Sequence, residues 1–297
     1  MKDFLIGDNA FIGVSHLSHD HARQRLKELH LETINRLFET ALSCGATGFS
    51  FTVHPTNLRI LDTLENVGTT SNLELYPILP YAAGYVRTVN EKGVGGLIND
   101  FMSRYSLADK AKLSLRVGFS TLTLDPTGMM RTYIDAELLP IVRVGGKLST
   151  ILLHEVVTDV AVSFQSRNLI DSYMQHVRDK YHVKPGFVTR NFARFVKFFR
   201  DVNLPLEDTI IMTPVNKIGF QMNPSREACE ACLSEIHGVS VIAMSILAGG
   251  YLTLEEAVGY IRQQNLSGTV VGVSSEDHAQ RVFTKLRGIA ESAKEKT

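Results

Sequence analysis

The amino-acid sequence predicts an α/β protein that folds as a single (β/α)8 TIM barrel, and three observations support this. Short apolar runs alternate with amphipathic stretches, which is the pattern of repeated βα units. The length of 297 residues fits one large barrel domain covering residues 1–297. No glycine-rich dinucleotide fingerprint follows the first predicted strand, which argues against the alternative, an open doubly wound sheet.

Eight apolar runs predict the strands. In chain order they cover residues 11–16, 47–53, 73–79, 149–155, 186–191, 208–216, 239–250 and 268–275. Most of them are followed by a stretch whose apolar residues recur at helical spacing. The best defined of these stretches are 31–46, the Phe-rich 192–202, the segment after Asn223 and Pro224, and the segment that opens with a capping box of Thr253 and Glu256.

The segment 81–148 is about twice as long as an ordinary βα unit and interrupts this rhythm. It includes two helix-like stretches and follows the third predicted strand. A βα excursion in a barrel lies over the end that carries the active site, so the segment could act as a lid. The alternative is additional helical packing on the outside of the barrel, and the sequence leaves both open.

The composition restricts the cellular compartment and the binding partners that we expect for this protein. Lys+Arg and Asp+Glu balance at 31 each, which gives no indication of a nucleic-acid partner. No apolar run is long enough to span a membrane, and the N-terminus lacks the apolar core of a signal peptide. The three cysteines are too few for a disulfide scaffold. We therefore expect a cytoplasmic protein that binds a small molecule. The sequence does not decide whether the protein forms a homo-oligomer.

Polar residues after the predicted strands are the candidates for catalysis, because barrel enzymes carry their chemistry there. His16, His54 and His154 follow the first, second and fourth strands, and Glu155 is adjacent to His154. These four side chains could bind a divalent transition metal such as zinc and leave a position open for water. The alternative is that the histidines form separate hydrogen bonds in a polar pocket.

His154 is a candidate general acid or base without a metal, because the ordinary pKa of histidine lies near neutrality. Glu155 points away from His154 in a regular strand, since adjacent strand residues alternate faces, unless the strand has already ended. Arg190 follows the fifth strand and is the candidate for holding an anionic group of the substrate.

The last two predicted strands are followed by a candidate phosphate site. Glycines let backbone N–H groups approach an anion, and a serine-capped helix N-terminus adds unpaired donors. Loops in this part of a barrel often bind phosphate. The alternative is a pair of ordinary tight turns. The residues concerned are Gly249, Gly250, Gly272, Ser274 and Ser275.

Other conspicuous residues are predicted to be structural. His19 and His21 lie in or near the first helix and are expected to be solvated. The single CxxC at 229–232 lies on a predicted helix without a second ligand pair, so we expect it to pack in the core. The same holds for three phenylalanines at helical spacing, Phe192, Phe195 and Phe199.

The second half of the sequence, roughly residues 149–285, resembles the aldo-keto reductase superfamily. The segments that carry the resemblance are ILLHEV, GFVTRNF, TPVNKIGFQMNP, VIAMSILAGGYLT and VVGVSSEDHAQ. The match is diffuse but collinear, and it puts His154 in the place of the catalytic histidine. The resemblance implies the same barrel, a phosphate-holding turn at Gly272, Ser274 and Ser275, and NADP as a candidate cofactor.

The first half departs from that family at three catalytic positions. Ser50 stands near the position of the family's Asp, and Pro55 stands near that of its Tyr. The third-strand segment LELYPILP has no lysine. The Tyr–Lys pair that protonates a carbonyl oxygen during hydride transfer in the family is therefore not matched.

Three functions follow from these observations. The first is an enzyme acting on a small anionic or phosphorylated substrate by acid/base chemistry, metal-assisted or not, as a lyase, isomerase or hydrolase. The second is an NAD(P)-dependent oxidoreductase with a rearranged proton donor. The third is a non-catalytic barrel that binds a ligand. Fold analogy alone does not decide among them.

Overall fold

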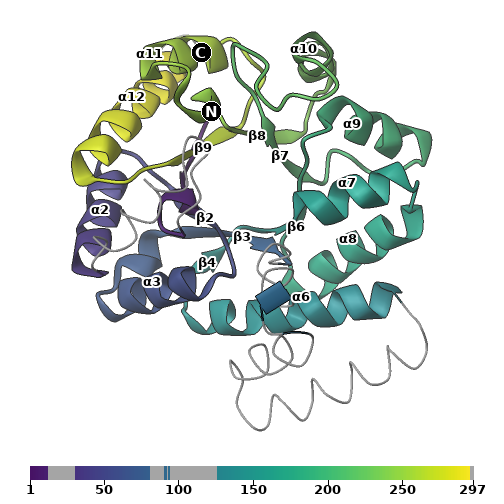
Figure 1. Cartoon of the computed structure of the whole chain (residues 1–297), viewed down its shortest axis with the longest axis horizontal. Coiled ribbons are helices and arrows are strands. Elements are labelled where there is room, and N and C mark those ends of the chain that lie inside the picture. The colour runs from purple at the N-terminus through teal and green to yellow at the C-terminus, as the bar shows by residue number, and fades with distance from the viewer. Residues whose placement is uncertain (13–30, 81–89, 92, 94–125, 295–297) are drawn as a thin grey trace, which may run out of the picture.

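A computed structural model describes residues 1–12, 31–80, 90, 91, 93 and 126–294 of the chain. Its strands form a closed parallel barrel surrounded by helices (Figure 1). The strands are β1 Asp3–Gly7, β2 Gly48–Thr52, β3 Glu74–Leu79, β4 Lys147–Leu148, β5 Thr150–Leu153, β6 Lys184–Val188, β7 Ile210–Pro214, β8 Ser240–Met244 and β9 Gly268–Gly272.

The strand order closes the sheet on itself. The order is β2-β1-β9-β8-β7-β6-β5-β3-β4, and β2 also pairs with β3. β4 and β5 both pair with β3 and are separated by one residue, Ser149, so together they form one strand of the barrel. The described residues thus give the eight-stranded parallel barrel that the sequence predicts.

The described helices lie around the barrel between successive strands (Figure 1). They are α2 Leu31–Ser43, α3 Pro55–Asn66, α6 Pro126–Arg143, α7 Glu155–Ser163, α8 Arg167–Tyr181, α9 Phe192–Asp201, α10 Arg226–Glu235, α11 Leu254–Ile261 and α12 Glu276–Lys294. Short 3-10 turns lie at η1 Asp8–Ala10, η2 Thr69–Asn72 and η3 Ala248–Gly250. None of these helices combines the length and the apolar character needed to cross a membrane.

Two apolar cores stabilise the barrel. The larger one lies between strands and helices and contains Phe192, Phe195 and Phe199 of α9, as the sequence predicts. A separate cluster comes from alternate strand residues and fills the inside of the barrel. It consists of Leu5, Tyr76, Leu152, Val188, Met212 and Ile242.

The CxxC segment is confirmed as a core-packing feature. Cys229 and Cys232 lie on α10 and are both buried and free. Burial raises the pKa of both thiols to about 11. Because a thiol must ionise to react or to bind metal, these side chains are inert at neutral pH.

The predicted first strand over residues 11–16 is wrong. The first strand of the barrel is Asp3–Gly7, while Phe11 and Ile12 lie in the turn after η1. Both runs are short and apolar, and periodicity alone does not distinguish them. Phe11 instead packs against Phe38 and Phe49 in the outer core.

Part of the long segment 81–148 is a helix of the ring. α6 forms the outer layer after β3 and packs against α8. Most of residues 81–125 lie outside the described residues, so their predicted role as a lid stays a prediction.

Candidate active site

His154 lies at the junction of β5 and α7, at the carboxyl end of the barrel. β5 ends at Leu153 and α7 begins at Glu155. Leu152 belongs to the cluster inside the barrel, so the side of the strand that faces the lumen continues to His154 two residues later. The sequence thus places this histidine at the mouth of the barrel.

The imidazole of His154 also caps helix α7. Its Nδ1 atom accepts a hydrogen bond of 3.2 Å from the backbone N–H of Val156. An Nδ1 atom that accepts leaves the proton of the neutral ring on Nε2. Burial lowers the pKa of His154, and Arg190 lowers it too, while Glu155 acts in the opposite direction. The ring is therefore neutral near pH 7, with Nε2–H as a donor.

Glu155 and Arg190 form an ion pair beside His154. The strand has ended before Glu155, which lies in the first turn of α7 and contacts Arg190 Nη2 at 2.6 Å. The Nε atom of Arg190 is buried and has no hydrogen-bond acceptor among the described residues. The guanidinium thus retains unused donor capacity at the end of β6.

Asp159, one helical turn after Glu155, fixes the turn that carries Arg190. Its carboxylate accepts hydrogen bonds from the Thr189 hydroxyl, from the backbone N–H of Arg190 at 3.2 Å and from the Asn191 side chain at 3.1 Å. One short helix, α7, therefore holds both His154 and Arg190. This role could not be predicted from sequence, because all three partners of Asp159 come from the turn after the neighbouring strand, β6.

His54 caps helix α3 in the same way that His154 caps α7. Its Nδ1 atom accepts a hydrogen bond of 3.1 Å from the backbone N–H of Thr56. Capping by histidine was not predicted, since the usual capping residues are Ser, Thr, Asp and Asn.

The metal hypothesis for His16, His54, His154 and Glu155 stays a prediction. His16 lies outside the described residues, and within them no group of three or more His, Cys, Asp or Glu side chains could hold a metal ion. A metal at Nε2 of His54 or His154 would also require the proton to leave that atom, which breaks the cap at Nδ1.

Asp8 is the residue that follows the true first strand. It is 6% exposed, and its Oδ2 atom accepts from the Thr52 N–H and the Thr52 hydroxyl, both at 2.8 Å, and from Asn57 Nδ2 at 2.7 Å. Burial raises its pKa against these hydrogen bonds. The apolar run DFLIG before Asp8 could have identified the first strand. Because the first strand was predicted further along the chain, Asp8 was not recognised as a residue at a strand end.

The structure shows where the three positions that depart from the reductase pattern lie in the fold. Ser50 lies opposite Gly7 and Tyr76 in the sheet, and its hydroxyl is buried without a partner among the described residues. Pro55 is the first residue of α3. β3 has no lysine.

The predicted phosphate residues lie in two turns. Ser275 caps α12, because its hydroxyl oxygen accepts from the His278 N–H at 3.2 Å. Gly249 and Gly250 have φ values of 71° and 98° in the turn after β8, a conformation that favours glycine. Gly272 ends β9 and Ser274 follows two residues later. A phosphate at these five residues stays a prediction.

A groove of about 950 Å³ lies between α11 and α12, beside these turns. Its lining includes Arg262, Arg281, Lys285 and His278, with Glu255 3.4 Å from Lys285. The lining of this groove therefore carries three cationic side chains and one carboxylate.

No protein-family model matches the sequence, and no curated protein matches it either. Solved structures do match. A Pseudomonas aeruginosa protein named as an aldo-keto reductase superposes with a TM-score of 0.58 at 10% identity, over 97% of this chain and 90% of that one. An aldo-keto reductase from Bacillus halodurans, in its holo form, gives 0.55 at 12% identity, over 96% and 86%. The chain therefore shares its fold, an eight-stranded parallel barrel, with the aldo-keto reductases.

Proposed function

We propose that this protein is an enzyme that acts on a small anionic substrate at the carboxyl end of its barrel. The observation that carries the proposal is the set His154, Glu155 and Arg190 held by one helix. Arg190 would hold the anionic group, and His154 would act on an oxygen of the substrate. Carboxylates and phosphates are the groups that a guanidinium binds best.

The cap on Nδ1 defines what His154 contributes. As long as Nδ1 accepts from Val156, the ring has no free lone pair and does not act as a base. It donates from Nε2 and stabilises negative charge that develops on a substrate oxygen, as neutral imidazoles at helix N-termini do. Enolisation, elimination and hydrolysis all develop such charge, so the proposal covers isomerase, lyase and hydrolase chemistry.

Turnover of small phosphorylated and carboxylated metabolites, followed by NMR, tests the proposal. We expect the wild type to convert at least one compound, and the variants His154→Ala and Arg190→Gln to lose at least a hundredfold of that rate, about 2.7 kcal/mol. Matched controls are His237→Ala and Arg194→Gln, which change exposed residues of the same types. Full activity of the His154→Ala variant would contradict the proposal.

A second candidate is an NAD(P)-dependent oxidoreductase, since the matched structures are named as aldo-keto reductases. The groove between α11 and α12 favours it, since Arg262, Arg281 and Lys285 suit the phosphates of a dinucleotide. The bound nicotinamide would supply or accept a hydride, and His154 would hold the carbonyl oxygen. Absence of NADPH and NADH binding at millimolar concentration would exclude this candidate.

A further inference from the structure

The main chain of Arg190 is held from two sides. Its N–H donates to the Asp159 carboxylate of α7 at 3.2 Å, and its carbonyl accepts from the Asn223 N–H at 3.1 Å. Asn223 lies in the loop 215–225, which connects β7 to α10. Helix α7 also carries Glu155, which pairs with the guanidinium at the far end of the side chain. The loop after β7 therefore gives Arg190 a contact that does not come from α7.

The way in which the backbone of Arg190 is held affects where its guanidinium lies. The side chain leaves the backbone at Cβ, so a main chain bound at both its N–H and its carbonyl fixes the start of the side chain. The ion pair with Glu155 holds the other end. A long side chain that is held at both ends loses less conformational entropy when it binds a ligand. The placement of the guanidinium thus depends on the position of Asn223.

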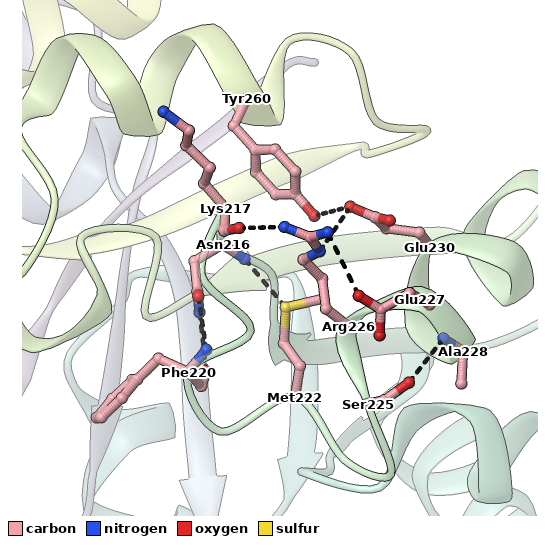
Figure 2. A network of polar contacts seen from close by, with 10 residues as sticks. All are labelled: Asn216, Lys217, Phe220, Met222, Ser225, Arg226, Glu227, Ala228, Glu230 and Tyr260. Atoms are coloured by element: carbon pink, nitrogen blue, oxygen red, sulfur yellow. Dashed lines mark hydrogen bonds and ion pairs between the residues drawn. The ribbon is translucent and has the colours of Figure 1, made fainter.

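Asn216 sets the shape of this loop (Figure 2). It lies two residues after the end of β7 and is fully buried. Its carboxamide accepts from the Phe220 N–H at 2.7 Å and donates to the Phe220 carbonyl at 2.8 Å. These two hydrogen bonds close the segment 216–220 into a compact turn. Aspartate at this position would have no donor for the carbonyl, so the contact requires an amide.

Met222 connects this turn to Asn223. The Asn216 N–H donates to the sulfur of Met222 at 3.3 Å, and the Met222 N–H donates to the Gly219 carbonyl at 3.1 Å. Met222 is buried in the outer core, where displacement of its side chain would leave a cavity. Because Met222 directly precedes Asn223 in the chain, its position determines where the Asn223 N–H lies.

Two contacts from α10 complete the support of the loop. Arg226 donates to the Lys217 carbonyl at 2.7 Å, and the Cys229 thiol donates to the Asn223 carbonyl with a sulfur–oxygen distance of 3.5 Å. Burial raises the pKa of Cys229 to about 11, so the thiol keeps its proton and remains a donor at neutral pH. Both main-chain polar groups of Asn223 therefore have partners.

We propose that Asn216 is a positioning residue for Arg190. Its hydrogen bonds set the shape of the loop after β7, and this loop holds the Arg190 carbonyl through the N–H of Asn223. Asn216 acts through Arg190 and takes no part in the chemical step. The inference rests on the proposed function, in which Arg190 holds the anionic group of the substrate.

The test uses inorganic phosphate as the probe, and its dissociation constant is measured by NMR at the backbone amides of Arg190 and Asn191. We expect Asn216→Ala to weaken phosphate binding about tenfold, as when a partner that orients a metal ligand is removed. The matched control is Asn265→Ala. The Asn265 side chain also donates to a main-chain carbonyl, that of Ile236 at 2.9 Å, but at the other end of α10, so phosphate binding should not change.

A second readout, taken without phosphate, separates positioning from a general loss of stability. In Asn216→Ala, the Asn223 amide should exchange with solvent about tenfold faster, and the Nε–H signal of Arg190 should shift. Asn265→Ala should show neither change. If Asn216→Ala does not fold, Met222→Leu replaces it, because leucine removes the sulfur acceptor at nearly constant volume. The same two changes are then expected, in the same direction.

The variant Arg190→Gln separates this inference from the proposed function. Weaker phosphate binding in Arg190→Gln supports the anionic site. Phosphate binding that is absent, or that does not respond to Arg190→Gln, contradicts the proposed function, and the two signals measured without phosphate still decide whether Asn216 positions Arg190. Unchanged signals in the loop variants overturn the inference. Wild-type phosphate affinity in Asn216→Ala, with binding lost in Arg190→Gln, overturns it too.

Discussion

At the scale of single residues, two candidate histidines lie at strand ends in the described structure, and each of them also caps a helix. His54 and His154 each use Nδ1 to cap a helix, through the N–H groups of Thr56 and Val156. Stability and chemistry therefore depend on different atoms of the same ring. The sequence identified both positions as candidates, because each follows a strand. The sequence did not reveal the caps, because any side chain with a hydrogen-bond acceptor can cap a helix, so a histidine at these positions gives no specific signal of a cap.

Substitution of His154 should separate these two tasks. His154→Ser keeps an acceptor for the Val156 N–H, so its free energy of unfolding should equal that of the wild type, while activity is lost. His154→Ala removes the acceptor too and should lower the free energy of unfolding by about 1 kcal/mol. Urea unfolding of the three proteins measures the difference. Equal stability of the Ala and Ser variants would show that the cap contributes nothing.

At the scale of elements, α6 and α8 are joined by a polar cluster around Asp135. This carboxylate of α6 accepts from Tyr181 and contacts His176, both at 2.7 Å, and pairs with Lys180 at 2.6 Å. Burial opposes its ionisation, but these contacts outweigh burial and lower its pKa to about 2. The cluster thus holds α6, which belongs to the long segment 81–148, against α8.

The pKa of Asp135 predicts an acid-dependent loss of stability. A carboxylate with a lowered pKa stabilises the fold fully above its ordinary pKa of 3.8, and the contribution disappears as the pH falls toward 2. The contribution should be about 2 kcal/mol. Unfolding free energies between these pH values should fall more steeply in the wild type than in Asp135→Asn. Parallel pH profiles would contradict the prediction.

At the scale of the whole molecule, closure of the barrel depends on the pairing of β1 with both β2 and β9. Asp8 reinforces the first of these pairings, because its carboxylate binds the last residue of β2 and Asn57 of α3. Because three donors bind one buried carboxylate, Asp8 holds the carboxyl ends of the first two strands together.

Loss of the Asp8 carboxylate should therefore weaken the whole fold. We expect Asp8→Asn to lower the free energy of unfolding by about 2 kcal/mol, because charge-assisted hydrogen bonds to buried donors are lost. Asn9→Ala, at the exposed neighbouring position, should change it by less than about 0.5 kcal/mol. Denaturant titration measures both. A wild-type midpoint for Asp8→Asn would contradict this account.

The barrel could be predicted from sequence because its signal is repeated eight times, so one misplaced strand at residues 11–16 did not change the fold class. The prediction of the site depended on single residues. Because the first strand was misplaced, Asp8 was not recognised as a candidate, and the argument for His16 was weakened. Contacts between neighbouring strand ends, such as Glu155 with Arg190 and Asn223 with Arg190, depend on a register that a single sequence does not specify.

The cap on α7 has one more consequence, for amide hydrogen exchange. The N–H of Val156 is protected only while the His154 ring stays in its capping orientation. A ligand that accepts from Nε2 holds the ring in that orientation, whereas a proton on Nδ1 expels it. The exchange rate of this one backbone amide is therefore a direct readout of whether the site is occupied, free or protonated.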